Sequence, residues 1–278
     1  MAAGNILITG ASSGIGLACA SRLAALGYRV FAGVRTEAAG EEVRRAANGI
    51  IPVTLDVCQP ASILSAIGAL EGEPLAALIN NAGVAAIGPM ELVPINEWRY
   101  QFEVNVIGLV AVTQACLPQL RRGKGRIVNI GSIAGRSALP GSGAYDSSKF
   151  ALEGISDSLR MELNPFGISV SLIEPGAIAT GIWQKTLAEL DQRNRQAPSD
   201  LRDLYSHLTL VIREQTKRSA ARALPPEAVA DAVLRAITAS RPKTRYVVGR
   251  DAQFWLLVNL LPDRVRDWLI LRNLREGR

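Results

Sequence analysis

The sequence predicts an α/β protein built on one doubly wound parallel sheet of about seven strands. Short runs rich in Val, Ile and Leu alternate with longer amphipathic stretches, as in folds where helices connect buried parallel strands. The first apolar run also leads directly into a glycine-rich turn and then into a helical pattern. No internal repeat or low-complexity linker interrupts this order, so residues 1–278 are expected to form a single domain.

Seven segments are short, apolar and rich in branched side chains, which predicts strands. These segments are Asn5–Thr9, Tyr28–Val34, Ile50–Leu55, Ala76–Asn80, Arg126–Gly131, Ile168–Glu174 and Thr244–Val248. Between them, apolar residues recur at helical spacing, which predicts helices connected to the strands by right-handed crossovers. The predicted helices are Ile15–Leu26, Ala38–Ala47, Ala61–Leu70, Asn96–Leu120, Ala144–Asn164 and Pro226–Ala239.

Two further segments lie outside this regular alternation. Residues 177–224 form the only long gap between sheet elements, after the sixth predicted strand. Ligands bind outside the carboxyl ends of parallel strands, so this segment is expected to form a helical lid over the substrate. The C-terminal segment, residues 251–278, is apolar and basic, and is expected to border the substrate entrance. It either covers the body or a neighbouring subunit, or contacts a membrane surface, because its apolar run is too short to span a bilayer.

The composition, with 48% hydrophobic and 20% charged residues, is typical of a packed soluble protein. The cysteines Cys19, Cys58 and Cys116 are far apart, which argues against a disulfide framework or a metal site and favours a cytoplasmic location. No signal peptide is indicated, and no stretch reaches the roughly 18 apolar residues of a membrane span. The net charge of +6 comes without a nucleic-acid-binding motif, so it is interpreted as a solvated basic face.

A glycine-rich turn connects the first predicted strand to the first predicted helix. Gly10 permits a sharp exit from the strand, Gly14 allows backbone to approach a pyrophosphate, and Gly16 allows close helix–strand packing. Ser12, Ser13 and Ile15 complete the turn at the helix N-terminus, where an anion is favoured. The turn alone is a weak signal, but its position between a strand and a helix predicts a dinucleotide site.

A tyrosine and a lysine form a second pattern. Tyr145 and Lys149 are four residues apart in a predicted helix, so their side chains share one face. A nearby ammonium favours the phenolate, which is expected to bring Tyr145 into range for proton transfer near neutral pH. Ser132 ends a predicted strand and Asn105 lies in the preceding helix.

Together these motifs closely resemble the short-chain dehydrogenase/reductase family, which has a Rossmann-type fold. The resemblance covers residues 5–180 almost without gaps. The segments that carry it are Thr9-Gly10-x-x-x-Gly14-x-Gly16, Asn80-Asn81-Ala82-Gly83, Asn105, Ser132, Tyr145-x-x-x-Lys149 and Pro175-Gly176-x-x-x-Thr180.

The resemblance implies catalytic roles for four residues. Ser132 would hydrogen-bond the substrate oxygen, and Tyr145 would donate or accept its proton. Lys149 would bind the nicotinamide ribose while favouring the tyrosinate, and Asn105 would hold a water that connects Lys149 to solvent. A hydride would pass between the nicotinamide and the substrate carbon.

The resemblance also implies a cofactor site along the strand ends. Asp56 and Val57 would lie by the adenine ring, and residues 81–83, Asn81, Ala82 and Gly83, along the adenine ribose. Pro175 and Gly176 would redirect the chain, and Thr180 would bind the nicotinamide carboxamide. Arg35 follows the second strand where no acid stands to hold a ribose 2′-hydroxyl, which predicts NADP(H) in preference to NAD(H).

Apolar lid residues favour a hydrophobic secondary alcohol or ketone as substrate; they are Ile182, Trp183, Leu187, Leu190, Leu204 and Leu208. The segment from Tyr28 to Arg35, with Thr54 to Asp56, resembles the branch with steroid (17-beta-hydroxysteroid) and retinol dehydrogenases. Steroid, retinoid and aliphatic substrates all stay open. So do two alternatives: a catalytically silent nucleotide-sensing protein, and a dehydratase or epimerase on nucleotide sugars.

Apolar surface on the helices 96–120 and 144–164 predicts a homodimer or homotetramer.

Overall fold

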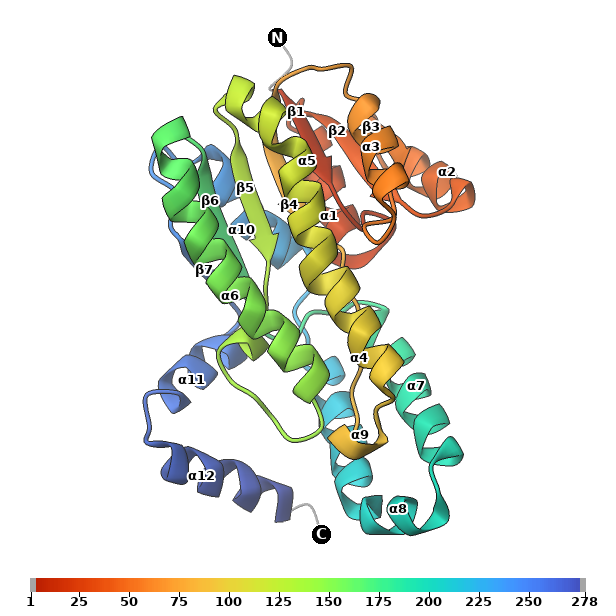
Figure 1. The fold of residues 1–278 in the computed structure, drawn as a ribbon. Coiled ribbons are helices and arrows are strands. Elements are labelled where there is room, and N and C mark those ends of the chain that lie inside the picture. The colour runs from red at the N-terminus through yellow and green to blue at the C-terminus, as the bar shows by residue number, and fades with distance from the viewer. Residues whose placement is uncertain (1–3, 276–278) are drawn as a thin grey trace.

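The computed structural model describes residues 4–275, with side chains to residue 272. The described residues form one seven-stranded parallel sheet in the order β3-β2-β1-β4-β5-β6-β7 (Figure 1). The strands are β1 Asn5–Ile8, β2 Arg29–Val34, β3 Ile50–Thr54, β4 Leu75–Asn80, β5 Arg126–Ile130, β6 Ser169–Pro175 and β7 Arg245–Val248. The strand order reverses between β1 and β4, which is where ligands bind in open α/β sheets. The predicted fold class is confirmed.

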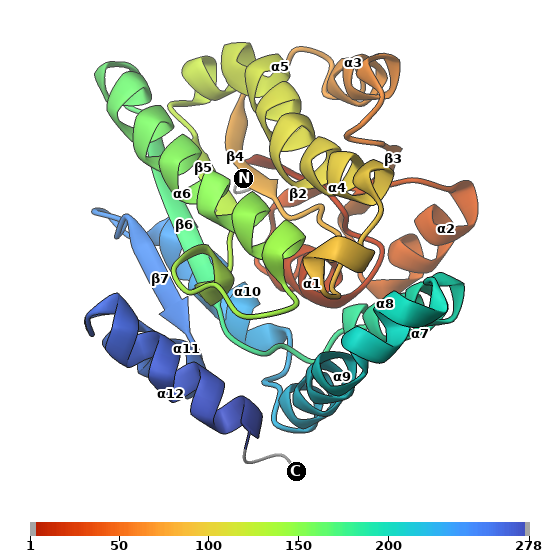
Figure 2. The same cartoon turned by 60° about the horizontal axis from the view of Figure 1, so that its bottom comes forward.

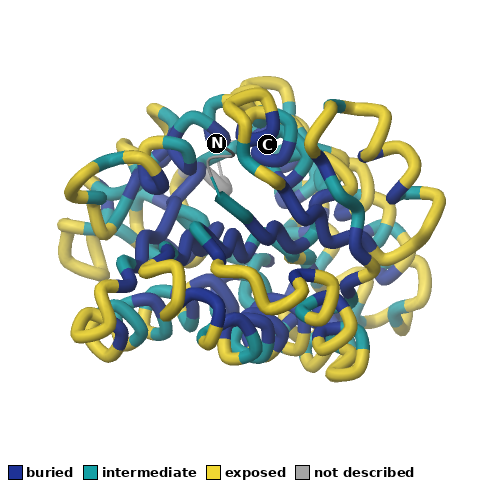
Figure 3. The backbone as a smooth tube through the Cα atoms, turned by 90° about the horizontal axis from the view of Figure 1, so that it is seen from above, coloured by how far each residue is buried: buried dark blue, intermediate teal, exposed yellow. Residues whose placement is uncertain are grey.

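Helices cover both faces of the sheet, and alternate residues of β1 show how. Ile6 and Ile8 pack with α1 (Gly14–Ala24), α2 (Glu37–Ala46) and α10 (Glu227–Thr238) in one fully buried cluster. Leu7 points to the opposite face, where it packs with α3 (Pro60–Gly68), α5 (Gly108–Gly123) and α6 (Gly143–Leu163). Burial is therefore concentrated along the central strands, while the outer turns of the chain are exposed (Figure 3).

The helix predicted over 96–120 is longer than expected and is not regular. It consists of α4 (Ile95–Phe102), a π-helical segment (Glu103–Ile107) and α5. π-Helical turns frequently occur at functional sites, and this one carries Asn105. The whole stretch, Ile95–Gly123, is the one helix among the described residues long and apolar enough to cross a membrane. Over half of its apolar window is buried inside the protein, as expected for a core helix.

The segment predicted as a lid, residues 177–224, forms three helices: α7 (Ile182–Gln196), α8 (Ser199–Leu204) and α9 (Ser206–Ala221). A bridge between Ile178 and Leu224 joins its two ends, so it leaves and re-enters the body at one place. Figure 2 shows these helices on one side of the molecule and α11 (Arg250–Val258) with α12 (Asp263–Arg275) on the other. Both groups extend beyond the carboxyl ends of the strands (Figure 1).

Candidate active site

A cavity of about 1110 Å³ lies at the carboxyl ends of the strands, between α7 and α9 on one side and the C-terminal helices on the other. The predicted site residues that line it are Gly10, Ser12, Ser13, Gly14, Ile15, Arg35, Asp56, Val57, Asn81, Ala82, Gly83, Ser132, Tyr145, Lys149, Pro175, Gly176 and Thr180. Gly16 and Asn105 lie behind its wall. The fold therefore brings together residues that are far apart in the sequence.

The glycine turn after β1 leaves room for a ligand by having no side chains. Gly10 and Gly14 have φ of +64° and +54°, a conformation that other residues rarely adopt. A Cβ on Gly14 would come within 2.9 Å of the Thr180 methyl carbon, and one on Gly10 would meet the Ala82 backbone at the same distance. A Cβ on Gly16 would collide with the Gly10 carbonyl oxygen, so its role is packing, as predicted.

The N-terminus of α1 opens into this cavity. Ser13 precedes the helix and its side chain forms no capping hydrogen bond, so the first N–H groups have no side-chain acceptor there. The helix dipole adds partial positive charge at the same place. A narrow glycine cradle with free N–H donors fits the pyrophosphate of a dinucleotide.

Thr9 and Asn81 fix the glycine turn against the loop that follows β4. The Thr9 hydroxyl oxygen accepts hydrogen bonds from the backbone N–H groups of Asn81 (3.0 Å) and Ala82 (2.9 Å). In return, the Asn81 amide donates to the carbonyl oxygens of Thr9 (3.0 Å) and Gly10 (2.8 Å). The hydrogen bonds of the Asn81 side chain are thus made to the glycine turn itself. Thr9 is a positioning residue: it belongs to the sequence motif, but the motif does not indicate these contacts.

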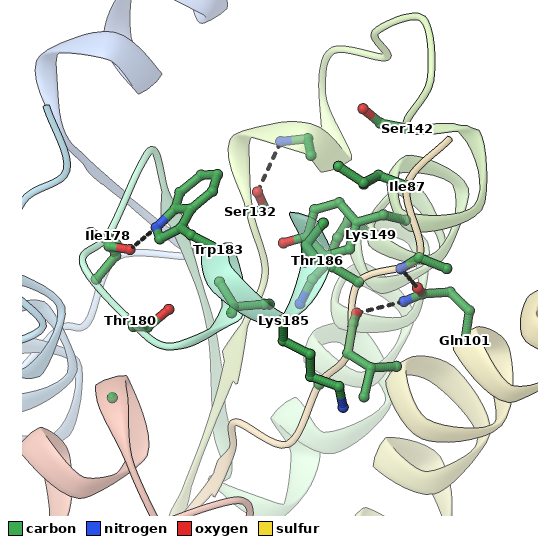
Figure 4. A pocket seen from close by; sticks show the side chains of 18 of the residues that line it. Ile87, Gln101, Ser132, Ser142, Lys149, Ile178, Thr180, Trp183, Lys185 and Thr186 are labelled. Carbon is green, nitrogen blue, oxygen red and sulfur yellow. Dashed lines mark hydrogen bonds between the residues drawn. The ribbon is translucent and has the colours of Figure 1, made fainter. Parts of the chain in front are cut away.

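Ser132, Tyr145 and Lys149 meet where β5 ends and α6 begins. Ser132 caps a short 3-10 turn, Ile133–Gly135, by accepting the N–H of Ala134 at 3.1 Å, and its hydroxyl lies near enough to the Tyr145 phenol to lower the pKa of that group. The Lys149 ammonium donates to the Ile130 carbonyl oxygen at 2.9 Å and lies 5.7 Å from the centre of the Tyr145 ring. Figure 4 shows Ser132 and Lys149 in the same pocket as Thr180.

Burial controls the ionisation of this pair. It raises the pKa of Tyr145 to about 12; the Ser132 hydrogen bond lowers that pKa, and the Asp146 charge raises it further. Burial also lowers the pKa of Lys149 to about 8. The expectation that Lys149 brings the phenol near neutrality is therefore wrong for this structure, because loss of solvation raises the pKa of Tyr145 and the ammonium is not among the groups that lower it. A protonated phenol at neutral pH is suited to donating a proton.

Asn105 stands behind the site, with 1% of its surface exposed. Its side-chain oxygen accepts the Val84 N–H at 2.9 Å, while its amide donates to the Val84 carbonyl oxygen (3.1 Å) and to the Ser148 hydroxyl (3.0 Å). These contacts tie the loop after β4 to α6 next to Lys149. The predicted water relay from Lys149 through Asn105 stays a prediction.

Gln101 repeats this arrangement one helical turn earlier, and sequence analysis missed it. Its side-chain oxygen accepts the Ala86 N–H at 2.7 Å, and its amide donates to the Val84 carbonyl oxygen at 2.7 Å and to Ser148 at 3.3 Å (Figure 4). Gln101 lies four residues before Asn105, so their shared helical face was the available signal.

Arg35 and Asp56 occupy the end of the cavity near β2 and β3. Arg35 is exposed and directly follows Val34, the last residue of β2. The Asp56 carboxylate accepts the Cys58 N–H at 2.9 Å, and the Asp56 backbone N–H donates to the Ser62 hydroxyl at 2.9 Å. These local hydrogen bonds hold the turn between β3 and α3. The end of β2 thus carries Val34 where an acid would repel a phosphate on the ribose 2′-oxygen, and a cation, Arg35, follows it.

Most of the apolar lid residues that were expected to contact the substrate do not line the cavity. Ile182 and Trp183 line the cavity, and Trp183 donates to the Ile178 carbonyl oxygen at 2.6 Å. The other four apolar candidates, Leu187, Leu190, Leu204 and Leu208, do not line it. Residues three and four apart share a helical face, and the face of α7 that lines the cavity beyond Trp183 is polar. Its members are Lys185, Thr186, Glu189, Gln192, Arg193 and Gln196.

Arg193 holds this lid to the body. Its guanidinium, 5% exposed, pairs with Glu97 of α4 and with Glu189 (3.3 Å), and donates to the Ile87 carbonyl oxygen at 2.6 Å. These contacts join α7, α4 and the loop after β4. No sequence pattern indicates these contacts, because Arg193 and Glu97 are distant along the chain.

The C-terminal segment also contributes to the cavity, as predicted for a flap at its edge. Trp255 of α11 and Ile270 of α12 line it. Asp251 accepts the Ala177 N–H at 2.7 Å and so holds the turn after β6. Among residues 4–275, no cluster of His, Cys, Asp and Glu could hold a metal ion.

Comparison with known proteins identifies the family. The model of the short chain dehydrogenase family matches residues 4–191. Retinol dehydrogenase 16 of Mus musculus is 34% identical, covering 95% of this chain and 87% of its own length, and 17-beta-hydroxysteroid dehydrogenase type 6 of Bos taurus is 34% identical, covering 96% and 88%. An NADPH-dependent 3-dehydrocapnine reductase of Ornithobacterium rhinotracheale is 36% identical and covers 97% of each chain.

A solved structure supports the same conclusion. A short-chain dehydrogenase from Streptomyces avermitilis superposes with a TM-score of 0.76 at 28% identity, covering 99% of this chain and 98% of that one. The resemblance to the branch with steroid and retinol dehydrogenases is confirmed by the relatives. The chain belongs to the short-chain dehydrogenase family and is an NAD(P)-dependent oxidoreductase that acts on CH–OH groups.

Proposed function

We propose that this protein interconverts a secondary alcohol and a ketone with an apolar body, with NADP(H) as the preferred cofactor. The observation that carries the proposal is that Ser132, Tyr145 and Lys149 line one cavity with the glycine cradle and Thr180, with the Lys149 ammonium 5.7 Å from the centre of the Tyr145 ring. Such a set provides an oxygen-binding hydroxyl, a proton donor and a cation in one place. It argues against a catalytically silent nucleotide sensor.

In ketone reduction, Ser132 would hold the carbonyl oxygen by donating a hydrogen bond from its hydroxyl. The Tyr145 phenol would then pass its proton to the same oxygen as negative charge develops there. The Lys149 ammonium would stabilise the tyrosinate that remains, since it lies 5.7 Å from the centre of the Tyr145 ring with one N–H bonded to Ile130. Bound NADPH supplies the hydride to the carbonyl carbon.

Four regions of this chain would hold the cofactor. The uncapped start of α1 and the glycine cradle fit the pyrophosphate, and Thr180 lies against Gly14 at the nicotinamide end. Arg35 would pair with a 2′-phosphate, which supports NADP(H) with NAD(H) as the second choice. The relative from Ornithobacterium rhinotracheale is NADPH-dependent by name, which agrees with this preference.

Self-association is part of the proposal. Five large apolar side chains remain exposed on α4, the π-helical segment and α6: Ile95, Tyr100, Ile107, Phe150 and Met161. Two copies of this face would cover each other in a two-fold dimer, from which a tetramer could be built. A monomeric mass by light scattering at micromolar concentration would contradict the assignment.

Peripheral membrane contact is proposed for the C-terminal helices. Leu257, Leu260 and Trp268 are 66%, 81% and 56% exposed, so they do not cover the body of their own chain. Arg264 stands exposed on the same helix as Trp268. Exposed aromatic and aliphatic residues with nearby arginines suit the surface of an anionic bilayer.

The test is the oxidation of NADPH and of NADH by the purified chain, measured spectrophotometrically across steroid, retinoid and aliphatic ketones. We expect turnover of at least one class with a higher kcat/KM for NADPH. The absence of turnover with every ketone and with the corresponding alcohols, in protein that binds NADPH, would refute the proposed activity.

A further inference from the structure

The cavity has two walls of opposite character. The wall formed by the turn after β5 and the C-terminal helices carries the larger apolar side chains, Leu139, Pro140, Trp255 and Ile270, beside the smaller polar residues Ser137 and Ser142 and the carboxylate of Asp251. The opposite wall belongs to α7 and α9, and nearly all of its side chains can form hydrogen bonds. The α9 members of this wall are Ile212, Gln215, Thr216, Arg218 and Ser219.

The polar wall also carries positive charge that its own acids do not neutralise. Arg193 already uses both Glu97 and Glu189. Lys185, whose side chain is 61% exposed, reaches Glu189 only at 3.9 Å. In the view of Figure 4 the Lys185 side chain lies between Thr180 and Gln101.

Arg218 is the second such cation. It forms no ion pair within 4 Å among the described side chains, and the nearby Glu214 is bonded to Lys217 at 2.9 Å. Lys185 and Arg218 thus face the cavity from two lid helices. Against them, an uncharged hydrocarbon would displace water from charged groups without replacing its hydrogen bonds.

We infer that the substrate is amphipathic: its anionic end lies against Lys185 and Arg218, and its alkyl part lies toward Leu139, Trp255 and Ile270. The carbonyl lies between these two ends, at Ser132 and Tyr145. This inference rests on the proposed ketone reduction and narrows its substrate class. It also explains why one lid face is polar in a cavity whose other wall carries the larger apolar side chains.

The test compares two ketones that differ only in charge: a γ-keto acid with a medium-length alkyl chain, and its methyl ester. We expect the wild-type protein to reduce the acid with a kcat/KM about tenfold above that of the ester. Raising the salt concentration should reduce this preference, because ions screen partly exposed charges.

Charge-removing variants locate the effect. Lys185→Gln and Arg218→Gln should each lower kcat/KM for the acid about three- to tenfold and leave the ester nearly unchanged. Arg195→Gln and Lys217→Gln are the matched controls, because they remove a charge from the same two helices at positions that do not line the cavity. The controls should retain the wild-type preference.

Three results would overturn the inference: equal kcat/KM for acid and ester, a preference for the ester, or the same loss in variants and controls. A rise only in the KM for NADPH would assign Lys185 to the cofactor, which also overturns it.

Binding of acid and ester to the protein with NADP⁺, measured by calorimetry, separates this inference from the proposed function. Acid-selective binding that depends on Lys185 and Arg218, without reduction of any ketone, would refute the proposed ketone reduction and support the proposed anion-binding site. Reduction of the ester, without acid-selective binding, would support the proposed ketone reduction and refute the proposed anion-binding site.

Discussion

The part of the chain up to β6 and the part after it hold their cavity residues in different ways. Up to β6, the reacting groups stand at strand ends or on helices whose other faces are buried, and Lys149 is only 7% exposed. After β6, the lid helices meet the body through charged contacts such as those of Arg193. Core packing thus holds the reacting groups in place, whereas the lid helices, to which we attribute substrate selection, have fewer apolar contacts with the body.

The largest expected effect tests the first part. Tyr145→Phe removes only the phenol oxygen, so the protein should fold and bind NADPH while kcat falls by about 10²–10⁴-fold. Steady-state kinetics and NADPH fluorescence titration measure the two properties. Tyr205→Phe is the control, since the Tyr205 hydroxyl bonds Glu91 on the surface and should change neither. Near-native turnover in Tyr145→Phe would remove Tyr145 from the mechanism.

The second prediction concerns pH and the same buried pair. Because burial lowers the pKa of Lys149 to about 8, its ammonium is charged below that pH and neutral above it. Ketone reduction should therefore decline by up to about tenfold per pH unit above pH 8, where the tyrosinate loses its stabilising cation. Lys149→Arg keeps the charge, so any residual activity should lack this descending limb. A wild-type profile that is flat to pH 10 would contradict the assignment.

These two predictions concern residues that the sequence indicated, and the reason is local spacing. Gly10 and Gly14 lie in one turn, and Tyr145 and Lys149 lie one helical turn apart, so a linear pattern shows them. The contacts of Arg193 with Glu97, and of Asp251 with Ala177, join distant segments and have no such pattern. Which face of α7 turns inward depends on how the whole lid is placed. A cytoplasmic location stays a prediction.

The third prediction tests the second part of the chain. Arg193→Gln leaves Glu97 without its cation, leaves Glu189 with only Lys185 at 3.9 Å, and frees the Ile87 carbonyl, which should cost about 1–3 kcal/mol of lid closure. We expect KM for the ketone to rise about tenfold with a smaller change in kcat, and faster amide exchange in α7. Arg213→Gln is the control, because it removes a more exposed pair with Asp191 in the same lid. Equal effects in both variants would show that Arg193 has no special role.

The fourth prediction returns to the cofactor end of the cavity. Arg35→Ala should lower kcat/KM for NADPH about ten- to hundredfold, the range expected for hydrogen bonds to a charged group, and leave the value for NADH unchanged. Arg44→Ala on α2 is the control, since that arginine pairs with Glu41 and does not line the cavity. Equal losses with both cofactors would mean that Arg35 does not recognise a 2′-phosphate.

The smallest effect is expected at the C-terminal helices, where the change should affect location and not chemistry. Replacing Leu257 and Trp268 by Ser removes exposed apolar surface without touching the cavity lining. Binding to vesicles that contain anionic lipid, measured by co-sedimentation, should fall several-fold, because a side chain that is only partly buried at a lipid surface contributes well below the about 1.5–3 kcal/mol of full burial. Turnover of a small soluble ketone should be unchanged. Leu204→Ser is the control, because Leu204 is 71% exposed at the end of α8, and Figure 2 shows α8 on the opposite side of the molecule from α12. If wild type does not bind the vesicles, or if Leu204→Ser weakens binding equally, these helices do not form the membrane-binding surface.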